Sequence, residues 1–152
     1  MHIRSRIMEA ASAAIEALEI IESVTVAGAS DAFPDSGAVV DMAWDAEQSE
    51  KMASRSAQGP ANGALDREPR LVIVATAQVP AQMSALTFDD RVIAPIEIAI
   101  ATSREIGRFA ADWWLERTEY AAMQDDEAAV LSASLHYRFV TRTPAADPSR
   151  PM

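Results

Sequence analysis

The stretch that decides the fold is residues 113–143, which read WWLERTEYAAMQDDEAAVLSASLHYRFVTRT. Its second half alternates apolar with polar side chains, and the apolar set is Leu131, Ala133, Leu135, Tyr137 and Phe139. A period of two turns one set toward a core and the other toward water or a partner. The first half carries Trp, Leu, Thr and Tyr, which suit a pleated surface, and the acidic run 125–127 marks a solvated turn. The stretch predicts a β-hairpin with a long second strand.

Length and composition indicate one folded domain. With 152 residues and a hydrophobic content of 49%, the chain can bury a single core within residues 1–143, followed by an extended tail at 144–152. No apolar run reaches the roughly 18 residues of a membrane span, and glutamates interrupt residues 1–19 where a signal peptide needs an apolar core. The chain has no cysteine, which excludes disulfides, thiolate nucleophiles and Cys-ligated zinc.

Periodicity predicts one helix and three strands ahead of the hairpin. An amphipathic helix is expected from His2 to Ile20, where apolar residues recur every three or four positions among abundant alanines. Strands are expected at residues 23–28, 38–45 and 71–79. The last of these is apolar on both faces from Leu71 to Val74, which is typical of a central strand covered on both sides at that end.

A second helix is expected after residue 86. Thr87 is its predicted N-cap, and an apolar stripe runs through Val92, Ile96 and Ile100. Pro95 removes a backbone donor inside this stripe, so the helix must either kink there or start late, with Pro95 in its first turn. The isoleucines also leave open a strand at residues 96–102.

Two segments have no periodic pattern. Residues 47–69 are rich in Ser, Ala, Gln and Gly and predict a long exposed loop, either disordered or ordered by a partner. Arg55, Arg67 and Arg70 are the charges that such an interface can use. The proline-rich residues 144–152 predict an extended tail.

The order of these elements predicts an α+β fold. We expect a mostly antiparallel sheet of about five strands with two helices packed on one face, a long exposed loop and an extended C-terminal tail.

Templates for catalysis and for ligand binding do not fit the residues present. The two histidines, His2 and His136, stand far apart in the sequence, and no Gly-x-Ser-x-Gly elbow or phosphate-binding glycine loop occurs. We therefore predict no catalytic, cofactor-binding or metal-binding residue and no enzymatic activity. Trp113 and Trp114 are adjacent, so a strand sends one to the core and the other to the surface, where it either anchors an interface or is covered by its own chain.

Taken in order, these pieces resemble the tail terminator proteins of long-tailed (siphovirus-type) phages and gene transfer agents, the group that includes the lambda minor tail protein U. MHIRSRIMEAASAAIEAL resembles the family's opening helix, RLVIVATAQV its central strand, TFDDRVIAPIEIAIA the helix that follows, and WWLERTEY…LSASLHYRFVTRT its closing hairpin. The ending PAADPSRP resembles the Asp-Pro-Ser ending of many members. Pro95 and the length of the 47–69 stretch depart from the family pattern.

The resemblance implies a structural role in the virion. Such proteins form a hexameric ring at the head-proximal end of the tail tube, stop tube growth, and join the tail to the head-tail connector or stopper protein. It implies assembly in the host cytoplasm, no cofactor and no membrane partner. The net charge of −10 fits DNA that passes through the ring without specific binding, because an acidic surface repels phosphates.

Seven residues are predicted interface contacts on this interpretation: Arg55, Arg67, Arg70, Trp113, Trp114, Asp147 and Pro148. Two alternatives stay open. One is another neck or tail-completion protein of the same build. The other is a monomeric α+β domain, ligand-binding or enzymatic, that uses a cleft near His136 and Trp114.

Overall fold

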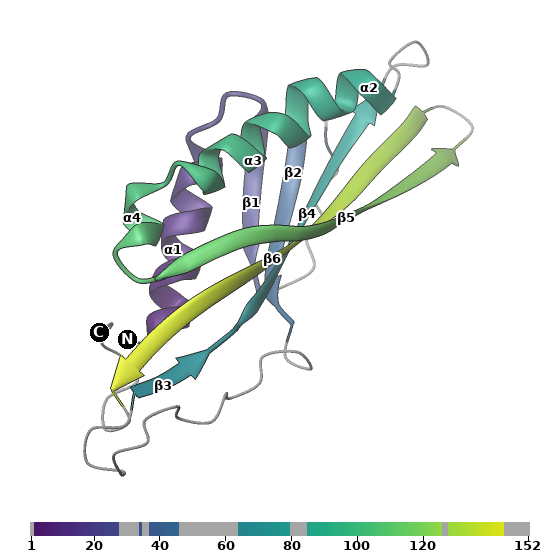
Figure 1. Ribbon diagram of the computed structural model, residues 1–152. Helices are drawn as coiled ribbons and strands as arrows, with labels where there is room; N and C mark the ends of the chain where they lie inside the picture. The colour runs from purple at the N-terminus through teal and green to yellow at the C-terminus, as the bar shows by residue number, and fades with distance from the viewer. Residues whose placement is uncertain are drawn as a thin grey trace.

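The computed structural model in Figure 1 describes residues 2–27, 34, 37–45, 64–79, 85–125 and 128–144. In chain order the elements are α1 (Ile3–Glu16), β1 (Ile21–Val26), β2 (Ala38–Trp44), β3 (Ala64–Arg67), β4 (Arg70–Val79), α2 (Ala85–Phe88), η2 (Asp89–Ile93), α3 (Ala94–Ala101), α4 (Arg104–Gly107), β5 (Asp112–Asp125) and β6 (Ala128–Pro144). The segments α2, η2 and α3 follow one another without a break and form one helical run, 85–101.

The strands form one mixed sheet in the order β1-β2-β4-β6, with β5 on the other edge of β6. β3 and β4 pair with successive parts of the same edge of β6 and act as one strand, interrupted at Glu68 and Pro69. Among the strands that the structure describes, β1 and β2 are parallel and the other pairs are antiparallel. The helices lie together on one face of the sheet (Figure 1). The predicted α+β class, with a mostly antiparallel sheet of about five strands, is therefore confirmed.

The hairpin and its alternation are also confirmed. β6 buries Ala133, Leu135, Tyr137 and Phe139 under the helices, while the intervening side chains are only half-buried. β5 pairs with β6 along almost all of its length, and one residue, Glu116, is extra between Leu115 and Arg117. This bulge leaves Glu116 without a partner residue and bends the strand locally.

The core packs β2, β4 and β6 against α1 and the 85–101 helical run. Its largest fully buried side chains are Phe88, Phe139, Ile3, Ile7, Ile15, Met42, Leu71, Ile73, Ile96, Ile100, Ile106 and Leu135. β4 is central, as predicted, but its two faces differ. Leu71 and Ile73 are fully buried under the helices, whereas Val72 and Val74 on the other face are half-buried. The expectation of cover on both sides is wrong, because all the described helices lie on one face.

The second helix accommodates Pro95 by widening before it. Residues 89–93 form a π-turn, in which the Ala94 N–H donates to the carbonyl of Asp89, five residues back. Proline lacks an N–H and its ring clashes with the carbonyl four residues back in a regular α-helix, so the wider turn relieves both problems. Pro95 then lies in the first turn of α3. The alternative of a strand at 96–102 is wrong.

Several predicted boundaries shift. The second helix begins at Ala85, which puts Thr87 inside the helix; the predicted N-cap is wrong because Phe88, only 1% exposed, needs a helical turn to reach the core. The first helix ends at Glu16, where the chain turns so that β1 can start at Ile21.

The predicted 47–69 loop ends in regular structure. Ala64–Arg67 forms β3 because β6 extends beyond the end of β4 and offers free backbone groups to pair with. β6 likewise continues to Pro144, the first residue of the predicted tail. Residues 46–63 and 145–152 lie outside the described part of the chain.

A substitution at Gly37 would test the close backbone approach between the segment after α1 and the start of β2. A Cβ at this position would collide with the backbone carbonyl oxygen of Ile20, which accepts a hydrogen bond from Ala38 at 2.8 Å. We expect Gly37→Ala to lower the free energy of unfolding by about 1–3 kcal/mol, measured from the urea midpoint. Gly107→Ala is the matched control, because its Cβ would meet Trp113 at an ordinary 3.6 Å. Equal stability of the two variants would contradict the close approach at Gly37.

Candidate interaction surface

The 85–101 helical run is tied to strand β5 at two points. Near its start, the Tyr120 hydroxyl donates to Oδ1 of Asp89 at 2.7 Å. Near its end, the Trp113 indole Nε1 donates to the carbonyl oxygen of Ile100 at 3.0 Å, and the same ring lies against Gly107. The two bonds hold helix and strand together while leaving the space between them unfilled.

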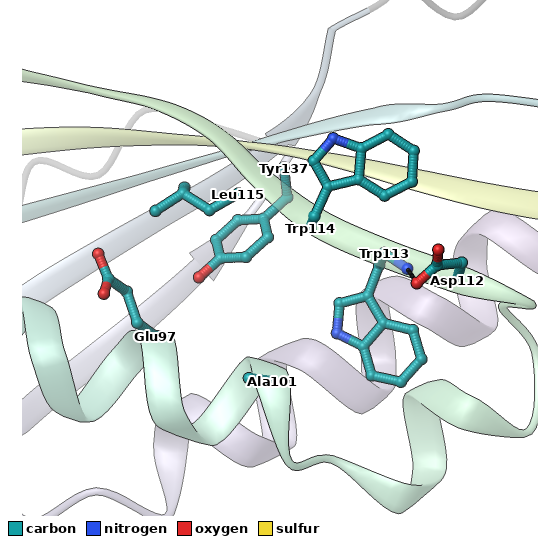
Figure 2. A pocket seen from close by; sticks show the side chains of 7 residues that line it. All are labelled: Glu97, Ala101, Asp112, Trp113, Trp114, Leu115 and Tyr137. Carbon is teal, nitrogen blue, oxygen red and sulfur yellow. Dashed lines mark hydrogen bonds between the residues drawn. The ribbon is translucent and has the colours of Figure 1, made fainter.

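A cleft of about 430 Å³ lies between α3 and the first residues of β5. Its lining is Glu97, Ala101, Asp112, Trp113, Trp114, Leu115 and Tyr137. Figure 2 shows Glu97 and Ala101 on the helical side, and Leu115, Tyr137 and Trp113 on the strand side. The Tyr137 hydroxyl and the Glu97 carboxylate lie at the same end of the cleft. The hydroxyl of Tyr137 therefore lies on the Glu97 side of the cleft, and the Trp113 ring lines the part near Ala101.

The pKa values of Tyr137 and Tyr120 reflect the negative potential of this region. Burial, and then the negative charge of Glu97, raise the pKa of Tyr137 well above its usual range. The hydrogen bond to Asp89 is the main cause that raises the pKa of Tyr120 to about 12, with burial and the charges of Asp89 and Glu97 adding to it. Both hydroxyls thus stay protonated and sit in a negative potential.

The opposite face of the sheet carries a chain of ion pairs. Glu116, the bulge residue, contacts Nε of Arg138 at 2.7 Å and Nε of Arg70 at 3.4 Å through its two oxygens. Arg138 also contacts Glu68 at 3.3 Å. The Nε–Glu116 contact of Arg138 is an ion pair without hydrogen-bond alignment. Each partly exposed pair contributes at most about 1 kcal/mol, so the chain sets orientation more than stability.

Trp114 lies beside this chain of ion pairs. Its side chain is 40% exposed, and the Arg138 guanidinium carbon stands 5.9 Å from its ring centroid. Trp113, one residue earlier, is half-buried under the helices. The predicted split of the tryptophan pair between core and surface is therefore confirmed.

The histidines make separate contacts. His2 caps α1 by accepting from the Arg4 N–H, and its Nε2 lies 3.0 Å from Arg67. Burial and the positive charges of Arg4 and Arg67 lower the pKa of His2. His136 lies on the sheet face opposite the helices, 3.6 Å from Glu119. Among the described residues, no group of three or more His, Asp or Glu side chains is placed to hold a metal ion.

The predicted interface residues are dispersed. Trp113 and Trp114 meet at the cleft, whereas Arg67 contacts His2 and Arg70 contacts Glu116. The other three, Arg55, Asp147 and Pro148, lie outside the described residues. The cleft predicted near His136 and Trp114 is bordered by Trp114 but not by His136.

Sequence reasoning missed Glu97 and Glu116. Glu97 had a signal that could have been used, because it is the only charged residue in the apolar run VIAPIEIAIA. Glu116 had none, because a bulge depends on the pairing register and leaves no mark in the local pattern.

The bond between Tyr120 and Asp89 can be tested by titration. Asp89→Asn removes the negative charge, so we expect the pKa of Tyr120 to fall from about 12 toward the usual 10.0. The native state holds this proton more tightly than the unfolded chain does. Its contribution to stability is therefore complete below about pH 10 and is lost as the pH rises toward 12.

Spectrophotometric titration of tyrosinate follows the change, because the chain has two tyrosines and the other, Tyr137, ionises well above its usual range. Asp90→Asn is the matched control, since it removes an adjacent exposed charge and leaves the bond intact. A titration curve that Asp89→Asn leaves unchanged would refute the contact.

Comparisons with known proteins leave the family undecided. A scan against protein-family models gives no match, and no curated protein matches the sequence.

Proposed function

We propose that the protein is a structural virion component, a tail terminator. It forms a ring at the head-proximal end of a tail tube, stops polymerisation of the tube and joins the tail to the head-tail connector. The observation that carries the proposal is the layered build of the subunit: a sheet with helices on one face, a second face that no described helix covers, and a long edge strand. The order of these elements also follows the tail terminator resemblance.

The edge strand β5 supports self-assembly. β5 spans Asp112–Asp125 and, within the described residues, pairs with β6 alone, so its outer edge keeps backbone donors and acceptors for another chain. Trp114 and Tyr120 add exposed aromatic surface along this strand. An unpaired strand edge can add a strand of another chain, and repeated heterologous contacts of this kind form a ring when the rotation between subunits closes.

The charge of the protein supports a role in which DNA passes through the ring without being bound by it. The formal net charge is −10, and on the sheet face opposite the helices Arg70 and Arg138 are engaged with Glu68 and Glu116. Paired guanidinium groups contribute little attraction for phosphates, so a ring of such subunits does not retain a duplex. No helix in the described ranges is both long and apolar enough to cross a bilayer.

A second candidate of the same class is another neck or tail-completion protein. It shares the build and differs in where the ring binds. The cleft between α3 and β5 favours a third candidate, a ligand-binding domain, and assembly state separates that class from the first two.

Light scattering tests ring formation. We expect a species larger than the protomer, with the hexamer as the number implied by the resemblance. Trp114→Ala should weaken assembly by about thirtyfold, because a buried tryptophan anchor contributes about 2 kcal/mol to an interface. Ile98→Ala is the matched control, since Ile98 is also apolar and 62% exposed but lies on the helical layer. A wild-type protein that stays monomeric even with purified tail tubes rules out the ring.

The terminator role has its own test. Deletion of the gene from its phage or gene transfer agent should give overlong tails, because tube growth loses its stop. Electron microscopy measures tail length directly. Complementation with the wild-type chain is the control, and tails of normal length in the deletion would point instead to another neck or completion protein.

A further inference from the structure

The cleft between α3 and β5 has the features of a cation site. Trp113 is fixed in orientation by its bond to the Ile100 carbonyl, and Tyr137 is held in the sheet, so two rigid aromatic side chains line the strand side. Aromatic faces attract cations through the negative charge of their π-systems. Tyr137 is only 3% exposed, so the half-buried Trp113 ring supplies the aromatic surface that a ligand can reach, and its fixed orientation needs no rearrangement.

The charged groups around the cleft also favour a positively charged ligand. Glu97 projects from the helical side, and no arginine or lysine in the described ranges forms an ion pair with it. Asp112 supplies a second carboxylate, whose Oδ1 accepts from the Trp113 N–H at 2.9 Å. Ala101 lies at the carboxyl end of the 85–101 helical run, so the negative end of the helix dipole is also at the cleft.

We infer that this cleft binds an arginine side chain of a protein partner. The guanidinium stacks on the aromatic wall and pairs with the Glu97 carboxylate. Charge complementarity selects a cation over an apolar group, because both carboxylates and the helix end favour positive charge. The presence of an aromatic ring and carboxylates in one cleft selects arginine over lysine, since a planar guanidinium can stack on Trp113 and also form paired hydrogen bonds with a carboxylate.

This inference goes beyond the proposed function and does not depend on it. The cleft is complete within one chain, so it binds its ligand whether or not the protein forms a ring. A ring or tail partner is one source of the arginine, but the chemistry is set by the cleft alone.

The test is a titration of the purified protein with the tripeptide Gly-Arg-Gly, blocked at both ends, followed by NMR of the tryptophan indole N–H signals. We expect a saturable shift of the Trp113 signal with a dissociation constant on the order of 1 mM. Glu97→Gln should weaken binding about tenfold, because it removes a charge-assisted hydrogen bond. Asp90→Asn is the matched control: it removes an equal, exposed charge from the same helical run and should leave binding unchanged.

Two peptides separate the possible ligands. Gly-citrulline-Gly has the shape of the arginine peptide without the charge, and equal binding would overturn the cation site. Gly-Lys-Gly, or tetramethylammonium alone, binding as tightly as Gly-Arg-Gly would overturn the choice of arginine. Absence of any Trp113 shift with Gly-Arg-Gly, or equal weakening by Glu97→Gln and Asp90→Asn, would overturn the inference as a whole.

Discussion

Backbone pairing along β6 is the constraint on which the rest of the structure depends. The strand pairs with β5 on one edge and with β4 and then β3 on the other. A slip of one residue would turn every core side chain to the opposite face, so the two ladders together hold the register. Leu135, Tyr137 and Phe139 then present the surface on which the helices pack. The position of each helix, and of the cleft beside α3, follows from that surface.

Local patterns predicted the elements that obey a single period. The alternation in residues 131–139 predicted both the strand and its buried face, and the stripe in α1 predicted the helix with its buried isoleucines. The pattern failed where tertiary pairing decides the structure. β3 is a strand because β6 offers it a free edge, although Ala64–Arg67 has no strand signal of its own. Thr87 has the chemistry of an N-cap, but burial of Phe88 moves the start of the helix upstream.

Sequence reasoning likewise predicted one part of the candidate site and missed the others. The opposite directions of Trp113 and Trp114 follow from the geometry of any strand, so sequence alone was sufficient. The cleft was beyond sequence reasoning, because it joins Glu97 of a helix to Tyr137 of a strand that follows much later in the chain. The ion pairs of Glu116 also required the structure, since the bulge decides where that side chain points.

The π-turn before Pro95 has a consequence for how this chain can vary in length. One residue advances a helix by about 100°, so the number of residues in the turn sets the rotational phase of everything after it. Ile96 and Ile100 reach the core, and the Ile100 carbonyl meets Trp113, only at the present phase. An insertion of one residue within 89–93 would therefore rotate the second half of the helix away from β5. Substitutions there are restricted as well, because Val92 and Ile93 are buried and Asp89 accepts the hydrogen bond of Tyr120.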